Sequence, residues 1–199
     1  MNKQFNKVNY SEYEGKYDES IKERLEQDPG SVNVETMREN LYGYTFMKKY
    51  ADGVIPDELS MDYWEERHEE IELDNLNFEE FEMPDNLDSL LEDMDDSPYF
   101  DVSPQEKLIL ETIDSTGDGK TPETALCVID VHQEYEYIQR VVRLSVLQLV
   151  KQSVRNGIDC LELKDYDGRI EKVYFDISRR FEVGYLNPST TLSSDTEGT

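Results

Sequence analysis

The stretch from Ser103 to Val131 constrains the fold of this chain most, because it has the pattern of a helix, a polar turn and a strand in succession. Ser103 and Glu106 have the spacing of a capping box, and Pro104 stands at the first helical position, where its missing N–H costs nothing. A helix is therefore expected to begin at Ser103. Its apolar residues predict a helix packed under other elements. These residues are Leu108, Ile109, Leu110, Thr112 and Ile113.

This helix is expected to end at a turn running from Ser115 to Gly119, where two glycines allow backbone angles that other residues resist. The run from Ala125 to Val131 then follows Pro122. It is short, apolar and rich in β-branched residues, which predicts a buried strand.

The C-terminal third has the pattern of a small antiparallel sheet. Ile158 to Leu163 and Arg169 to Ile177 alternate apolar and polar residues on either side of a turn at 165–168, which predicts a hairpin. The inward residues are expected to be Leu161, Leu163, Val173, Phe175 and Ile177. Between Glu134 and Val154 the pattern fits both helix and strand, and we favour a short helix to about Arg140 followed by a strand.

The N-terminal third is predicted to be helical. Apolar residues at three- and four-residue spacing indicate one helix from about Ser11 to Gln27, and Asp28-Pro29-Gly30 ends it. Asn33 has the character of an N-cap for a second helix running towards Tyr50. Gly43 lies inside that helix, where glycine costs about 1 kcal/mol relative to alanine.

Together these patterns predict an α+β fold in which N-terminal helices pack on a small C-terminal antiparallel β-sheet. We expect a single domain over residues 1–186, with an acidic helical or loop insert at about 57–101 and a disordered tail at 187–199.

The same sequence indicates a soluble cytoplasmic protein that does not bind membranes. It contains no apolar run near the roughly 20 residues that span a bilayer, and residues 1–16 lack the apolar stretch of a secretion signal. Cys127 and Cys160 lie in predicted strands beside apolar neighbours, so we expect free thiols acting as small hydrophobes rather than a disulfide.

Charge is concentrated in the middle of the chain. Residues 57–101 hold 1 Lys or Arg and 19 Asp or Glu, so they carry −18 of the formal net charge of −26. Such a field repels nucleic acids and anionic membranes and speeds the encounter with basic proteins. We therefore expect a basic protein partner and no nucleic acid.

The acidic segment also contains apolar residues at regular spacing. Residues from about Pro56 to Leu73 predict a helix with one apolar face, and Pro84 could open a short helix ending near Met94. Three interpretations remain: a solvated strip that covers the core, a docking surface in which aromatics anchor a basic partner, and a cation site. The absence of glycine from the segment disfavours a calcium loop.

Under the docking interpretation, partner-binding residues are aromatic anchors and the carboxylates around them. They are Asp62, Trp64, Glu65, Glu66, Glu69, Glu70, Glu72, Phe78, Glu79, Glu80, Phe81, Glu82, Asp88, Glu92, Asp93, Asp95 and Asp96.

Motifs for a cofactor, metal or catalytic site are incomplete, so we expect none of these and no enzyme. Gly117 to Thr121 contains Gly-Lys-Thr, but the order helix, loop, strand does not feed a helix N-terminus that could hold phosphate. Read as a calcium loop, the same turn has Ala125 where the bidentate acid belongs. Glu65 and His68 have the spacing of a carboxylate metal site without its second copy, and no nucleophile elbow or Cys/His pair is present.

Several motifs resemble those of a bacterial family called domain of unknown function 4919. They are LYGYTF from Leu41, the block from Ser115 to Val131 with the following Glu134-Tyr135, and VYFDI from Val173. The resemblance covers about Tyr10 to Glu182. It implies an α+β domain with N-terminal helices and a C-terminal sheet, and it implies no activity.

Three functions remain open. The first is an immunity or inhibitor protein that neutralises a basic toxin or nucleic-acid-binding protein with its acidic face. The second is a non-inhibitory adaptor or chaperone for a secreted effector. The third is an enzyme with an unrecognised site. A salt-sensitive complex with a basic protein would favour the first two over the third.

Overall fold

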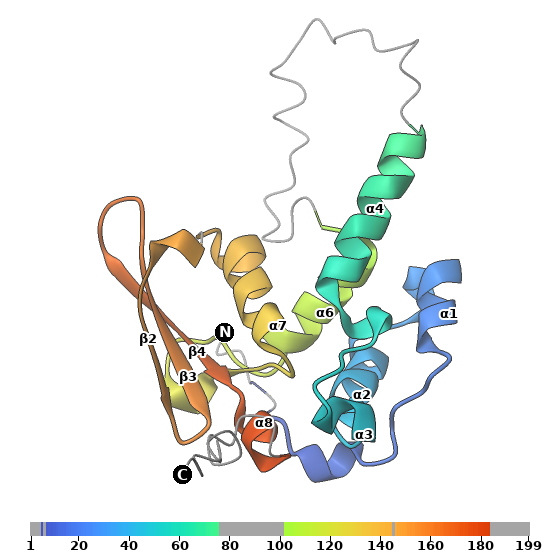
Figure 1. Cartoon of the computed structure of the whole chain (residues 1–199), viewed down its shortest axis with the longest axis horizontal. Coiled ribbons are helices and arrows are strands. Elements are labelled where there is room, and N and C mark those ends of the chain that lie inside the picture. Colours follow the sequence, from blue (N-terminus) through green and yellow to red (C-terminus); the bar gives the residue numbers. More distant parts are fainter. Residues whose placement is uncertain (1–4, 6, 76–101, 145, 184–199) are drawn as a thin grey trace, which may run out of the picture.

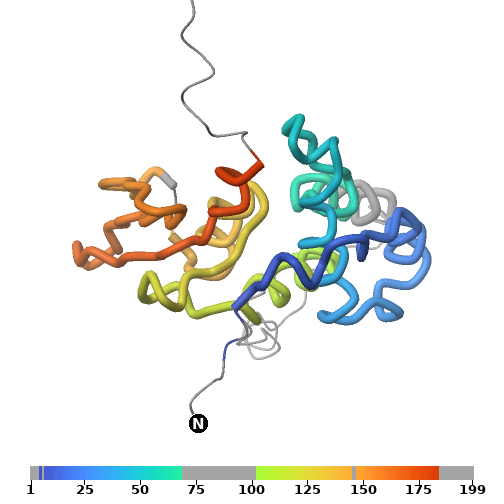
Figure 2. Tube along the Cα trace, turned by 90° about the horizontal axis from the view of Figure 1, so that it is seen from below, coloured from blue at the N-terminus to red at the C-terminus, as the bar shows by residue number. Residues whose placement is uncertain are grey.

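The computed structural model describes residues 5, 7–75, 102–144 and 146–183, and it has the expected α+β architecture. Helices from the first half of the chain form one side of the molecule and the sheet forms the other (Figure 1). Seen from below, α6 (Pro104–Asp114) and α7 (Val131–Tyr137) lie between the two sides (Figure 2). No helix among the described residues is long and apolar enough to cross a membrane.

The predicted helix from Ser11 to Gln27 is wrong, because the chain breaks it in the middle. A 3₁₀ turn, η1 (Tyr10–Tyr13), precedes Gly15, whose φ of +72° ends the turn. The side chain of Asp18 then accepts hydrogen bonds from the backbone N–H and the hydroxyl of Ser20. Only after this local turn does α1 (Ile21–Gln27) begin, followed by η2 (Pro29–Ser31).

The second helix, α2 (Val34–Tyr44), starts at the expected cap. The Asn33 side chain accepts a hydrogen bond of 2.9 Å from the backbone N–H of Thr36. The helix ends at Tyr44 rather than running on to Tyr50, because Met47 adopts an extended conformation before α3 (Lys48–Ala51).

One helix lies in the first part of the acidic insert and another begins just after it. The predicted start at Pro56 is corrected to Met61, because the 3₁₀ turn η3 (Asp57–Leu59) precedes α4 (Met61–Asn75). Helix α6 begins as predicted, since the Ser103 hydroxyl accepts from the Glu106 N–H and the Glu106 carboxylate accepts from the Ser103 N–H. The helix expected from Pro84 lies outside the described residues.

The strand expected from Ala125 to Val131 is much shorter in the structure. After the 3₁₀ turn η4 (Pro122–Thr124), β1 is only Leu126–Cys127, and α7 begins at Val131. The Gln133 side chain accepts a 3.0 Å hydrogen bond from the Ile129 N–H, so the chain leaves the sheet at this point. A π-helical turn, η5 (Ile138–Val142), and η6 (Val146–Gln148) then lead to the sheet, which agrees with a short helix followed by a strand.

The sheet is mixed rather than purely antiparallel. Its order is β1-β4-β3-β2, and β3 (Ile158–Lys164) pairs antiparallel with both β2 (Leu149–Arg155) and β4 (Ile170–Asp176). Strand β1 pairs parallel with β4. The five residues expected to face inward are buried, and Phe175 packs edge-on against Tyr137 of α7 at 5.9 Å between ring centroids.

Tyrosines connect the helices to the sheet. The hydroxyl of Tyr42 donates to the Cys127 carbonyl and that of Tyr50 donates to the Ile129 carbonyl, each at 3.0 Å. Arg180 of the last helix, α8 (Ser178–Glu182), donates to the Tyr50 carbonyl and lies 4.0 Å over its ring. Because all three groups are buried, these bonds fix the two sides against each other.

We predict that Gly43→Ala destabilises the fold, although helix propensity alone would favour alanine by about 1 kcal/mol. A Cβ on Gly43 would lie 2.7 Å from the backbone nitrogen of Tyr17, so backbone segments must separate. The expected loss is about 2 kcal/mol in the free energy of unfolding, measured with urea. The exposed Glu35→Ala in the same helix is the control and should change stability by less than about 0.5 kcal/mol. A gain on Gly43→Ala would contradict the close approach.

Candidate functional site

Helix α4 carries the first part of the predicted docking surface. Its C-terminal half extends beyond α6 and α1 (Figure 1). Asp62 and Glu66, four residues apart, are exposed on it. Glu69, Glu70 and Glu72 belong to the same helix, but their side chains lie outside the description. The described part of α4 therefore offers two carboxylates to a partner.

Trp64 does not belong to this surface, and its assignment as an anchor is corrected. Its side chain is only 2% exposed, and its indole N–H donates to the Glu58 carbonyl. Its ring packs edge-on against Tyr63 at 4.9 Å between centroids. The apolar face of α4 buries Trp64 in the core, so it holds the helix in place rather than contacting a partner.

Glu65 is engaged inside the molecule. Its carboxylate forms an ion pair with the guanidinium of Arg140 from the π-helical turn η5. Arg140 also lies 3.5 Å from Glu136, whose pKa is raised by burial. This cluster ties α4 to the end of α7, so reversing the charge of Glu65 would disturb the fold as well as the surface.

The remaining predicted partner-binding residues lie outside the described residues, so the structure does not place them. They are Phe78, Glu79, Glu80, Phe81, Glu82, Asp88, Glu92, Asp93, Asp95 and Asp96.

A buried pair of carboxyl groups was not predicted from the sequence. Glu134 of α7 is fully buried and Asp159 of β3 is 2% exposed. As ionised carboxylates, neither Glu134 nor the Oδ1 of Asp159 finds a hydrogen-bond donor among the described residues, whereas a proton on Glu134 allows the two side chains to hydrogen-bond to each other. Burial, with the charges of Asp159 and Asp130, raises the pKa of Glu134 to about 9, so this side chain is protonated at neutral pH.

One sequence signal could have revealed one member of this pair, Asp159. The period-2 alternation in Ile158–Lys164 places Asp159 on the same face as Leu161 and Leu163, which is the buried face. No comparable local signal marks Glu134, because its burial depends on where α7 lies against the sheet.

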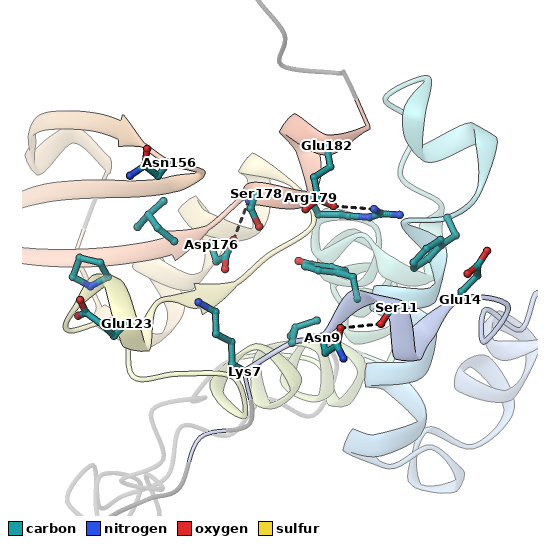
Figure 3. A pocket seen from close by; sticks show the side chains of 15 residues that line it. Lys7, Asn9, Ser11, Glu14, Glu123, Asn156, Asp176, Ser178, Arg179 and Glu182 are labelled. Atoms are coloured by element: carbon teal, nitrogen blue, oxygen red, sulfur yellow. Dashed lines mark hydrogen bonds and ion pairs between the residues drawn. The ribbon is translucent and has the colours of Figure 1, made fainter.

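A cleft of about 660 Å³ lies where the N-terminal segment, the end of β4 and α8 meet (Figure 3). Arg179 forms part of its wall and is held by Thr45, whose hydroxyl and carbonyl both accept hydrogen bonds, and by Glu182 at 3.0 Å. Its guanidinium also lies 4.2 Å over the ring of Phe46. Sequence reasoning missed this cleft because segments about 170 residues apart build it.

The glycine-rich loop is a structural turn. The Asp118 side chain accepts hydrogen bonds from the Lys120 N–H and the Thr124 hydroxyl, and the backbone N–H groups of Asp118 and Gly119 donate to the Thr124 carbonyl. These bonds close the loop on η4. Within the described residues, no group of three His, Cys, Asp or Glu side chains is arranged to hold a metal, and both cysteines are free thiols.

Comparison with known proteins gives one match. The sequence profile of a family described as "Domain of unknown function (DUF4919)" matches residues 6–184. No curated protein and no solved structure matches the chain.

We predict that Glu134→Gln flattens the pH dependence of stability. A carboxyl group with a pKa of about 4.3 when unfolded and about 9 when folded holds a proton only in the folded state between those values. Stability therefore falls as pH rises through this window, by up to about 1.4 kcal/mol per pH unit. Glutamine, which does not titrate, removes this slope.

The measurement is urea unfolding at pH 5.5, 7.0 and 8.5. The exposed Glu171→Gln is the matched control and should parallel the wild type. An unchanged slope in Glu134→Gln would show that Glu134 is not the titrating group.

Proposed function

This chain belongs to the DUF4919 family, whose description assigns no activity, and from its own residues we propose that it is a protein-binding module for a basic partner. In its specific form, the proposal is a cytoplasmic immunity or inhibitor protein that neutralises a basic toxin or nucleic-acid-binding protein. Free thiols at Cys127 and Cys160 suit a reducing compartment.

The observation that carries the proposal is the exposed acidic side of α4 on a chain of net charge −26. Asp62 and Glu66 face solvent, while Trp64 and the Glu65–Arg140 ion pair hold the helix from the other side. Because the helix is fixed, its carboxylates are preorganised for Lys and Arg side chains of a partner, and little conformational entropy is lost on binding.

Electrostatic attraction gives such a surface both a high association rate and selectivity for basic partners. A strongly negative protein is steered towards positive surfaces, and the association rate falls as salt screens the charges. The positive cleft of a nuclease or toxin normally receives a polyanion. An acidic helix can occupy the same cleft and exclude the polyanion, and in this way the surface would inhibit the partner.

The second candidate is a non-inhibitory adaptor or chaperone, which the same charge distribution supports. The two functions differ in one measurable property, because an inhibitor abolishes its partner's activity on binding and an adaptor leaves it intact.

We predict that Asp62→Lys/Glu66→Lys weakens the complex with a basic partner by tenfold or more at low salt, about 1.4 kcal/mol or more. The partner is obtained by co-purification from the native cell and identified by mass spectrometry, and its affinity is then measured by calorimetry. The variant keeps Glu65 and Trp64, so it should unfold at the wild-type temperature.

Asp167→Lys/Glu171→Lys is the matched control, because it changes net charge equally on the β3–β4 hairpin, where both residues are exposed. It should retain affinity. Equal losses in both variants would show that total charge rather than α4 governs binding, and no loss in either would refute the docking surface.

A further inference from the structure

Asp176, the last residue of β4, is a buried carboxylate without a cationic partner. It is 6% exposed, and its Oδ1 accepts a 3.0 Å hydrogen bond from the Ser178 N–H. Within the described residues, no Lys, Arg or His nitrogen lies within 4 Å of it. A single backbone donor compensates a buried charge only in part, so the site favours an added positive charge.

The unpaired charge acts on the groups around it. Burial, together with the charge of Asp176, raises the pKa of the Cys127 thiol to about 11. Burial also raises the pKa of the Tyr10 and Tyr42 hydroxyls, and Asp176 again contributes. These three side chains come from different segments, so the negative potential of Asp176 spreads through this part of the core.

Asp176 lines the cleft, and its second oxygen, Oδ2, is not among the buried atoms that lack a partner. Oδ2 therefore opens to the hollow. Figure 3 shows Asp176 facing the same space as Lys7, with Ser178 next to Asp176 and Asn156 farther away, in another part of the wall. The Ser178 side chain thus stands beside an accessible carboxylate oxygen.

The other charged groups of the cleft leave it negative. Its cations are Lys7 and Arg179, and its other carboxylates are Glu14, Glu123 and Glu182. Arg179 already forms an ion pair with Glu182 and a hydrogen bond to Thr45, so the charges of Arg179 and Glu182 cancel each other. The charge of Lys7 is then outweighed by three carboxylates, Asp176, Glu14 and Glu123, so an incoming cation is favoured over an anion.

We propose that this cleft is a binding site for a small organic cation, an alkyl ammonium or alkyl guanidinium, whose charged group pairs with Asp176. The walls include Val8, Phe46, Pro122 and Ile158, which suit an alkyl chain. The volume of about 660 Å³ lies within the range of small-molecule sites. The site is separate from α4, so Asp62→Lys/Glu66→Lys should bind the cation as the wild type does.

The test is calorimetric titration of the full chain with butylguanidinium and with butylurea, its neutral analogue of nearly the same shape. The guanidinium should bind at least tenfold more tightly, because a charged donor to a buried carboxylate is stronger than a neutral one. Equal binding of butylurea would overturn the proposal.

Asp176→Asn supplies the decisive variant, because asparagine can still accept the Ser178 N–H while the charge is lost. It should weaken butylguanidinium at least tenfold and, without ligand, raise the melting temperature, since a buried unpaired charge is removed. Exposed Glu171→Gln, which removes the same charge outside the cleft, should change neither. A lower melting temperature in Asp176→Asn would assign Asp176 a structural role and overturn the proposal.

Lys7→Gln tests the sign of the ligand's charge. Removing Lys7 should tighten butylguanidinium binding, because Lys7 repels a cation in the same cleft. Weaker binding would mean that the ligand uses Lys7, which contradicts the proposal.

Titration with N-acetyl-arginine methylamide then distinguishes two sources of the cation. Stronger binding than that of butylguanidinium indicates that the natural ligand is an arginine side chain of a protein. Weaker binding indicates a free amine or guanidine.

Discussion

The hydroxyls of Tyr42 and Tyr50 determine how the rest of the structure is assembled. Each donates to a backbone carbonyl, of Cys127 and Ile129, in the short segment that passes from the sheet to α7. That segment pairs with β4 over only two residues, so it has few ladder bonds of its own. The tyrosines supply the missing partners and thereby hold the helical side of the molecule against the sheet.

Arginines add further links between parts of the fold. Arg180 lies over Tyr50, Arg179 stacks on Phe46, Arg38 donates to Tyr13 and Ser115, and Arg140 pairs with Glu65. Each of these cations joins segments distant in sequence. These four arginines therefore serve the packing of the fold, whereas the formal net charge of −26 follows from the excess of 46 Asp and Glu over 20 Lys and Arg.

Local patterns in the sequence predicted the elements that short-range bonds determine. The capping box at Ser103, the cap at Asn33 and the β3–β4 hairpin are all confirmed, because each depends on residues a few positions apart. Periodicity failed between Ser11 and Gln27, where Gly15 breaks a helical pattern. Trp64, Glu134 and the cleft could not be placed correctly, because their surroundings come from contacts between distant segments.

The two buried carboxyl sites show how position decides the way in which a charge is neutralised. Glu134 of α7 lies buried beside Asp159 of β3, and it is not among the residues that line the cleft described above. A proton is the one cation small enough to neutralise a carboxylate in such a closed interior. Glu134 therefore keeps its proton to higher pH, which is what its raised pKa means. Asp176 keeps one oxygen open to a cleft, so a larger cation can reach it. The first site therefore makes stability depend on pH, whereas the second makes it depend on a ligand, and a bound cation would stabilise the junction that the tyrosines hold.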